Sequence, residues 1–176
     1  MTIQFSDLLH DKNLLAALRS AGYIEPTPIQ VQALPAAIDG RDIMASAQTG
    51  SGKTAAFLLP SLQRITRRSD KPGKGPRILV LTPTRELAAQ VEKNAKIYAQ
   101  NMKWLRTVTL VGGSSFGFQI KSLAKPIDLV VATPGRLMDH MRSGRIDFDR
   151  LEVLVLDEAD RMLDMGFIDD IRNIMQ

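Results

Sequence analysis

Five apolar segments recur along the chain and alternate with segments of helical periodicity. The apolar segments are residues 42–47, 77–82, 106–111, 127–133 and 151–157, and several are apolar throughout. Continuous apolar character is typical of strands that are buried on both faces of a sheet. Helical patterns lie between them, at residues 53–65, 84–100, 115–124 and 135–144. This alternation predicts an α/β fold, with a parallel sheet joined by right-handed crossovers and helices on both faces.

The ends of the chain add further helices to this prediction. Two are expected before the first strand, at Ser6 to Ala21 and at Pro28 to about Asp39. The last residues, 167–176, also have a helical pattern and lack a glycine cap or a polar tail. We therefore expect a truncated chain whose residues 1–176 form one domain.

Composition narrows the class of protein. The 176 residues include no cysteine, which excludes disulfides, zinc–thiolate sites and thiol nucleophiles. No apolar run reaches the ~20 residues that span a bilayer, and the N-terminus lacks the pattern of a signal peptide. The net charge is +4, and much of it lies at residues 64–77, where glycine and proline indicate a surface loop. These features predict a cytoplasmic protein with no membrane partner.

A glycine-rich segment, AQTGSGKT at residues 47–54, lies between the first expected strand and a helix. It fits the phosphate-loop pattern G-x-x-x-x-G-K-[ST] except at Ala47, where the pattern has glycine. Free backbone N–H groups at the start of a helix bind anions. Lys53 is then expected to neutralise phosphates and Thr54 to ligate Mg²⁺. The alternative at this point is a glycine-rich turn that binds nothing.

An acidic pair follows the last apolar segment. Four apolar residues, 153–156, lead directly to Asp157 and Glu158. Buried carboxylates are costly unless they serve a purpose such as metal binding. We assign Asp157 to Mg²⁺, directly or through water, and Glu158 to positioning the hydrolytic water. The alternative is a strand that ends in solvent, with the acidic residues capping the next helix.

Taken together, these motifs resemble those of DEAD-box RNA helicases. The acidic motif reads DEAD at residues 157–160, and four others occur in order: GYIEPTPIQ at 22–30, PTRELAAQ at 83–90, GG at 112–113 and TPGR at 133–136. Alanine at position 47 is usual in that family, whereas Tyr23 replaces a more usual phenylalanine. The resemblance covers nearly the whole chain, and it implies the first RecA-like domain of a bacterial-type enzyme.

The resemblance implies roles for the residues that match the motifs. Lys53, Asp157 and Glu158 are expected to be catalytic. Gln30 is expected to recognise adenine, with Phe5 or Tyr23 packed nearby, although Thr27 and Gln30 also fit a helix capping box. The expected ATP contacts are Phe5, Tyr23, Thr27, Gln30, Gln48, Thr49, Gly50, Ser51, Gly52, Lys53 and Thr54. The expected contacts to the RNA sugar–phosphate backbone are Pro83, Thr84, Arg85, Gly113, Thr133, Gly135 and Arg136.

These RNA assignments have a local alternative, because Thr84 and Thr133 could simply cap helices and the two arginines could be surface residues. Trp104 and the six phenylalanines have no spacing that suggests a stacking platform, and most are expected in the core. The sequence predicts RNA binding that is independent of base sequence.

The family's second RecA-like domain, with the arginines that complete catalysis, is absent from residues 1–176. We therefore expect this piece alone to bind nucleotide but to hydrolyse it slowly. In RecA-like domains a strand that follows the acidic motif lies between the acidic strand and the phosphate-loop strand, so the sheet is expected to lack a central strand. Two other functions remain open: a noncatalytic RNA-binding module that responds to nucleotide, and a phosphate-loop ATPase with no RNA partner.

Overall fold

The computed structural model describes residues 1–67 and 69–176. The chain divides into two compact units. Unit 1 comprises Met1–Arg68 and Lys93–Trp104, and unit 2 comprises Ser69–Glu92 and Leu105–Gln176. Each unit is described by itself below.

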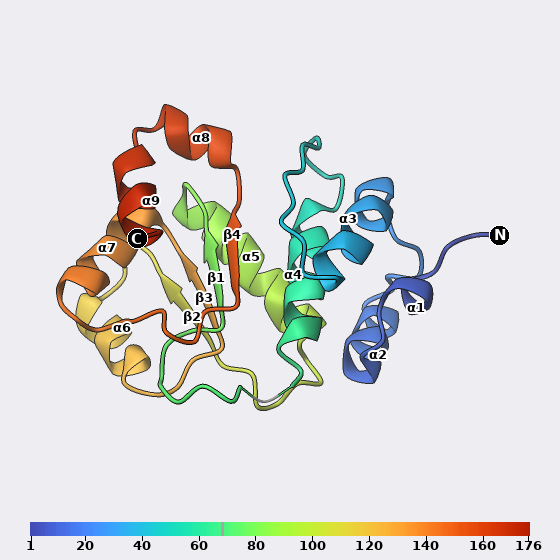
Figure 1. The fold of residues 1–176 in the computed structure, drawn as a ribbon, viewed down its shortest axis with the longest axis horizontal. Coiled ribbons are helices and arrows are strands. Elements are labelled where there is room, and N and C mark those ends of the chain that lie inside the picture. Colours follow the sequence, from blue (N-terminus) through green and yellow to red (C-terminus); the bar gives the residue numbers. More distant parts are fainter. Residues whose placement is uncertain (68) are drawn as a thin grey trace. The chain divides into compact units, whose positions relative to one another are not determined.

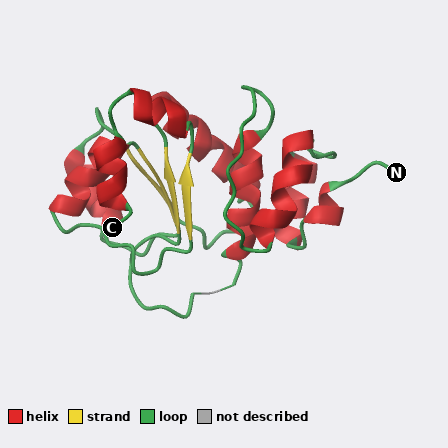
Figure 2. Cartoon of the chain, turned by 45° about the horizontal axis from the view of Figure 1, so that its top comes forward, coloured by secondary structure: helices red, strands yellow, loops and turns green. Residues whose placement is uncertain are grey.

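Unit 2 contains a parallel sheet of four strands (Figures 1 and 2). The strands are β1 (Ile78–Leu81), β2 (Thr107–Leu110), β3 (Leu129–Ala132) and β4 (Val153–Leu156), in the order β2-β3-β1-β4. Every residue of the two inner strands, β1 and β3, is buried. The continuous apolar runs therefore form buried strands of a parallel sheet, as predicted. The edge strand β4 is only half-buried.

Helices cover both faces of this sheet. They are the beginning of α5 (Arg85–Tyr98), α6 (Phe116–Leu123) and α7 (Pro134–Arg142), followed by α8 (Ala159–Asp164) and α9 (Ile168–Ile174). The crossover from β1 to β2 runs in the opposite direction to those from β2 to β3 and from β3 to β4. Right-handed crossovers therefore place α5 on one face and α6 and α7 on the other. Figure 1 shows α6, α7 and α9 together on one side of the strands.

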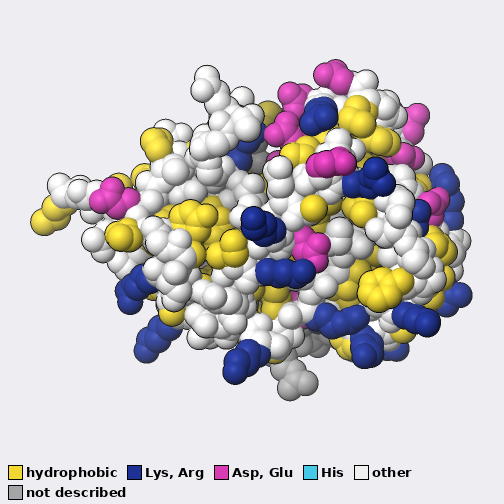
Figure 3. All heavy atoms as spheres, turned by 180° about the vertical axis from the view of Figure 1, so that it is seen from behind, with side chains coloured by type: hydrophobic (Ala, Val, Ile, Leu, Met, Phe, Trp, Pro, Cys, Tyr) yellow, Lys and Arg dark blue, Asp and Glu magenta, His cyan; other side chains and the backbone are white. Residues whose placement is uncertain are grey.

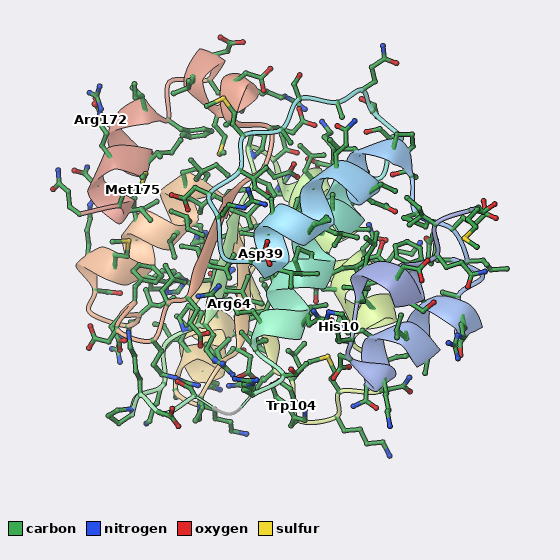
Figure 4. All side chains as sticks on the ribbon, turned by 45° about the vertical axis from the view of Figure 1, so that its right-hand side comes forward. His10, Asp39, Arg64, Trp104, Arg172 and Met175 are labelled. Atoms are coloured by element: carbon green, nitrogen blue, oxygen red, sulfur yellow. The ribbon has the colours of Figure 1, made fainter. Side chains whose placement is uncertain are left out.

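The regular secondary structure described in unit 1 consists of helices. It contains α1 (Phe5–Leu8), α2 (Lys12–Ser20), α3 (Pro28–Ile38), α4 (Lys53–Arg64) and the end of α5. Helix α3 packs against α4, and Figure 4 labels Asp39 and Arg64, which lie at their carboxyl ends. The core of this unit includes the fully buried Leu14, Leu34, Leu58, Leu59 and Leu62.

The single helix expected at residues 6–21 is wrong, because the structure divides this segment into α1 and α2. Asp11 ends the break between them, since its side chain accepts a hydrogen bond from Leu14 N at 2.9 Å and caps α2. The Gln63 side chain accepts hydrogen bonds from the backbone N–H groups of His10 and Asp11. Local capping therefore outweighs the continuous helical pattern.

The strand expected at residues 42–47 is also wrong. These residues have no regular secondary structure, and the side chains of Ile43 and Met44 are exposed. A strand is stable only when neighbouring backbone groups complete its hydrogen bonds. Within the described residues, the four-stranded sheet offers this segment no pairing. An apolar sequence without a paired neighbour is not sufficient to form a strand.

The basic segment at residues 64–77 is largely irregular after Arg64, as expected of a loop, and Arg68 lies outside the described residues. The last residue of the segment departs from that expectation. Arg77 is buried and pairs with Glu152, with 2.6 Å between Arg77 Nε and Glu152 Oε1. Within the described residues, no helix is long and apolar enough to cross a membrane.

Candidate nucleotide and RNA sites

The phosphate loop lies in unit 1 and leads directly into α4. Gly50 and Gly52 adopt positive φ values of 81° and 87°, and Gly52 is the N-cap residue of the helix that begins at Lys53. The Ser51 hydroxyl oxygen is buried and has no hydrogen-bond partner among the described residues. A curled backbone, a helix N-terminus and an unsatisfied hydroxyl together fit a bound phosphate group. Gln48, Thr49 and Gly50 are exposed, whereas Lys53 and Thr54 are half-buried.

Gln30 connects α3 to this loop within unit 1. Its side chain is 5% exposed, accepts a hydrogen bond from Thr27 N at 3.0 Å and donates one to Gly52 O at 3.1 Å. Thr27 and Gln30 form the capping-box arrangement, although the buried Thr27 Oγ1 has no partner of good geometry among the described residues. The capping interpretation is thus confirmed for Gln30. The contact with Gly52 also brings two expected ATP-binding residues together.

The two aromatic residues expected near adenine differ in exposure. Phe5 is 4% exposed and belongs to the core of unit 1, whereas Tyr23 is 44% exposed. Tyr23 makes an edge-to-face contact with Tyr98, with 6.1 Å between ring centroids. Burial, with a smaller contribution from Tyr23, raises the pKa of Tyr98 to about 12. Of the two candidates, Tyr23 therefore presents more of its ring to the surface.

The acidic pair lies in unit 2, at the carboxyl end of β4. The Asp157 backbone N–H donates to Leu81 O at 2.9 Å, which continues the pairing of β4 with β1. Glu158 has a φ of 54°. Among the described residues other than glycine, it is the one with a positive φ. Such strained backbone costs on the order of 1–3 kcal/mol and is concentrated at functional sites. The described residues contain no cluster of three potential metal-binding side chains.

Residues of three sequence motifs line one cavity of unit 2, at the carboxyl edge of the sheet. The cavity has a volume of about 410 Å³. Its lining comprises Pro83, Thr84, Arg85, Glu86, Gly112, Thr133, Gly135, Arg136, Asp139 and Phe167. Six of the seven expected RNA contacts are in this lining. The seventh, Gly113, lies against the Arg85 guanidinium, which a Cβ at Gly113 would contact.

The two threonines of this cavity behave differently as helix caps. The Thr84 hydroxyl accepts a hydrogen bond from Leu87 N at 3.2 Å, so the local alternative explains its position. Thr133 precedes α7 but makes no side-chain capping hydrogen bond. Capping therefore accounts for Thr84 and leaves the Thr133 side chain without that role.

Two buried polar residues beside the cavity were not predicted from the sequence. Gln119 on α6 and His140 on α7 are 2% and 0% exposed, and 2.7 Å separates Gln119 Oε1 from His140 Nε2. Burial lowers the pKa of His140, with a further lowering from Arg136 and an opposing effect of Asp139. The available signal was weak: Gln119 lies in a largely apolar helical segment, whereas His140 is one of several polar residues of α7.

The expectation that most aromatic residues are core residues holds only in part. Phe5 is buried, and Phe148 and Phe167 pack against the core of unit 2. Trp104, Phe116 and Phe118 are exposed by 50%, 36% and 71%. Phe116 nevertheless has partners, because it stacks on His140 with ring centroids 4.3 Å apart and lies under Arg136.

Comparisons with known proteins agree with the motifs. The model of the DEAD/DEAH box helicase family matches residues 27–176. The chain is 47% identical over 171 residues to the ATP-dependent RNA helicase DeaD of Escherichia coli, covering 97% of this chain and 27% of that protein. It is 48% identical over 170 residues to the ATP-dependent RNA helicase SrmB of the same organism, covering 97% of this chain and 38% of SrmB.

A eukaryotic protein shows similar agreement. The chain is 49% identical over 173 residues to a probable ATP-dependent RNA helicase, ddx27, of Dictyostelium discoideum, covering 98% of this chain and 22% of that protein. The chain thus spans between 22% and 38% of the length of these three relatives. The parallel sheet with flanking helices agrees with the expected RecA-like fold.

Proposed function

The chain belongs to the DEAD/DEAH box helicase family, and we propose that residues 1–176 are the N-terminal ATP-binding part of an ATP-dependent RNA helicase. The observation that carries this proposal is the cavity at the carboxyl edge of the sheet. Residues from three separate motifs line it, and they include the hydroxyl groups and arginines that bind phosphates without recognising bases. The names of the relatives support RNA as the substrate. A cytoplasmic location is part of the same proposal.

The phosphate loop is proposed to bind the triphosphate of ATP. Lys53 neutralises charge on the β and γ phosphates, and the N–H groups at the start of α4 contact phosphate oxygens. The remaining phosphate contacts are Gln48, Thr49, Gly50, Ser51 and Gly52. Thr54 and Asp157 would hold Mg²⁺, partly through water, and the ion would offset negative charge on the phosphates. Glu158 orients the water that attacks the γ phosphate.

Gln30 can recognise adenine without giving up its present hydrogen bonds. A carboxamide has two N–H donors and an oxygen that accepts twice. Thr27 N and Gly52 O use one acceptor position and one donor of Gln30. One donor and one acceptor position are left for adenine N7 and N6, with Phe5 or Tyr23 packing nearby. Capping of α3 and selection of ATP over GTP are thus compatible roles.

Hydrolysis at a useful rate is proposed to need a second RecA-like domain, which would lie outside residues 1–176. In related phosphate-loop enzymes an arginine that stabilises the transferring phosphoryl group accelerates the reaction by about 10³ to 10⁵. The edge strand β4 pairs with β1 and is only half-buried, so its other edge could accept a further strand.

Calorimetric titration with ATP, ADP and GTP in the presence of Mg²⁺ tests this function. We expect the wild type to prefer adenine nucleotides, and the substitution Lys53→Ala to abolish binding while thermal unfolding stays cooperative. Lys12→Ala is the matched control, because Lys12 is an exposed lysine at the start of α2. Binding that survives in Lys53→Ala would contradict the phosphate-loop assignment.

A second measurement separates the proposed function from its alternatives. A labelled single-stranded RNA should bind the full-length protein, and RNA should stimulate its hydrolysis of ATP. Hydrolysis without RNA binding would favour a phosphate-loop ATPase with another partner. RNA binding that depends on nucleotide, without any turnover, would favour a noncatalytic module.

A further inference from the structure

The charged side chains that line the cavity in unit 2 balance one another. Arg85 and Arg136 are accompanied by Glu86 and Asp139 in the same lining. Asp139 Oδ2 lies 3.8 Å from Arg136 Nε, and both residues are on α7. Figure 3 shows exposed Lys and Arg side chains, but the cavity itself has no excess of positive groups. Phosphate binding in the cavity therefore depends on the orientation of the Arg85 and Arg136 side chains.

Gln119 uses its side chain to join the segments around Arg136. Its Nε2 donates to Val111 O at 3.0 Å, immediately before the Gly112–Gly113 turn. Its Oε1 accepts from Arg136 Nη1 at 3.3 Å, and Arg136 Nη1 also donates to Ser114 O at 3.3 Å. Helix α6, the turn after β2 and the start of α7 are therefore linked through one amide.

The partners of Gln119 also determine the state of His140. Because Val111 O is an acceptor, the amide nitrogen must face it, and Oε1 must face His140. Two acceptors cannot share a hydrogen bond, so His140 Nε2 carries a hydrogen and donates it. His140 Nδ1 is buried and has no partner among the described residues. The neutral Nε2–H tautomer is the form that fits this site.

Phe116 restrains the same arginine from another side. Its ring stacks on His140 with an interplanar angle of 8°, and Arg136 Cζ lies 5.4 Å from its centroid. A cation over an aromatic face is attracted to it. The Arg136 guanidinium is thus held by an amide, a carboxylate, a backbone carbonyl and a ring.

We propose that Gln119 is a positioning residue, held in one orientation by neutral His140, that directs Arg136 toward the RNA phosphate beside the Gly112–Gly113 turn. The inference rests on the proposed function, since it concerns the same RNA-binding surface. A buried amide costs free energy unless its hydrogen bonds are complete, and an apolar side chain of similar size would pack in its place. The use of all three bonds to fix cavity-lining segments is what distinguishes Gln119 from a residue that only fills space.

A double-mutant cycle on the full-length protein tests the proposal. The variants are Gln119→Met, Arg136→Ala and the pair, with Gln32→Met as a matched control at an exposed glutamine of α3. The binding of a fluorescent oligouridylate is measured by anisotropy over a series of salt concentrations. We expect Gln119→Met to weaken binding about three- to tenfold, the size of one lost hydrogen bond. The double variant should bind no more weakly than Arg136→Ala, because Gln119 acts through Arg136.

The salt dependence reports on the arginine rather than on general stability. Losing one phosphate contact to a single strand lowers the magnitude of the slope of log K against log salt concentration by about 0.7. Arg136→Ala and Gln119→Met should both lower it, and Gln32→Met should not. His140→Gln, which supplies an N–H in place of Nε2–H, should bind like the wild type, whereas His140→Leu should resemble Gln119→Met.

The outcomes separate this inference from the proposed function. Absence of RNA binding by the wild type, or an Arg136→Ala variant that binds normally, overturns the proposed function and the inference with it. If Arg136→Ala weakens binding while Gln119→Met leaves affinity and salt slope unchanged, only the inference fails. Additive losses in the double variant overturn it too. Thermal unfolding of each variant shows whether a loss of binding merely follows a loss of folded protein.

Discussion

The phosphate loop of unit 1 and the cavity of unit 2 differ in how their functional groups are held. Residues 42–46 and 48–50 are exposed and irregular, and the Ser51 hydroxyl has no partner among the described residues. In the cavity, by contrast, a single side chain, that of Arg136, contacts four residues: Ser114, Gln119, Asp139 and Phe116. The RNA side is arranged by the chain's own contacts, whereas on the nucleotide side the contact of Gln30 with Gly52 anchors the loop. Ligand binding should therefore change the first region more than the second.

The largest effect should come from removing that anchor with Gly52→Ala. A Cβ at Gly52 would collide with the Gln30 side chain and lie 2.9 Å from Thr27 Oγ1, and the residue has a φ of 87°. Gln30 is buried and hydrogen-bonded, so it cannot easily move. We expect a loss of about 2–4 kcal/mol in stability and a severe loss of ATP affinity. Thermal unfolding and calorimetry measure the two effects.

The matched control is Gly50→Ala. Gly50 has a similar φ of 81°, but a Cβ there would meet nothing within 4 Å. Its cost should be limited to about 1–2 kcal/mol of backbone strain. Equal losses in the two variants would show that the contact with Gln30 does not hold the loop.

A second, smaller effect is expected from Gln30→Ala. The substitution removes the bond to Thr27 N, worth about 1 kcal/mol as a helix cap, and the bond to Gly52 O. If Gln30 also recognises adenine, the preference for ATP over GTP falls by about tenfold. Parallel ATP and GTP titrations measure it. A lower thermal midpoint with unchanged base preference would leave capping as the whole role of Gln30.

The same contrast explains what the sequence could and could not predict. Four apolar runs became the four strands because each found a neighbour in the sheet, whereas the equally apolar residues 42–47 found none among the described residues. The motif residues were identifiable, since each follows a strand or opens a helix. Gln119 and His140 were not, because their role arises from contacts between α6 and α7 that no local pattern encodes.

A third prediction concerns the cavity through Gly113→Ala. A Cβ at Gly113 would displace the Arg85 guanidinium, and the φ of 79° adds strain. We expect RNA affinity to fall about three- to tenfold, as for one disturbed hydrogen-bonding group, with ATP affinity unchanged. Gly144→Ala is the control, since Gly144 has a φ of 66° and open space around its Cβ position. If both variants bind RNA equally well, the position of Arg85 does not matter to binding.

The smallest expected effect is a pH dependence of the free energy of unfolding, which arises from His140 beside the cavity. Burial lowers the pKa of His140 from its ordinary 6.5, Arg136 lowers it further, and Asp139 opposes them. The unfolded chain therefore binds a proton below about pH 6.5 that the folded chain does not, and stability is lost as the pH falls. One proton limits this contribution to about 1.4 kcal/mol per pH unit. Above pH 6.5 it should be complete and constant.

His140→Gln isolates this contribution, because a carboxamide can donate to Gln119 Oε1 but does not titrate. Thermal midpoints of the wild type and the variant, measured from pH 7.5 to pH 5, should converge as the pH falls, since only the wild type loses the stability of an uncharged His140. ATP affinity should show no corresponding difference between the two proteins, because His140 is not among the proposed ATP or Mg²⁺ contacts. Parallel curves would mean that folded His140 accepts its proton as readily as the unfolded chain does. Gln119 Oε1 would then face a charged ring that keeps its Nε2–H, so the hydrogen bond between the two side chains would persist under mildly acidic conditions.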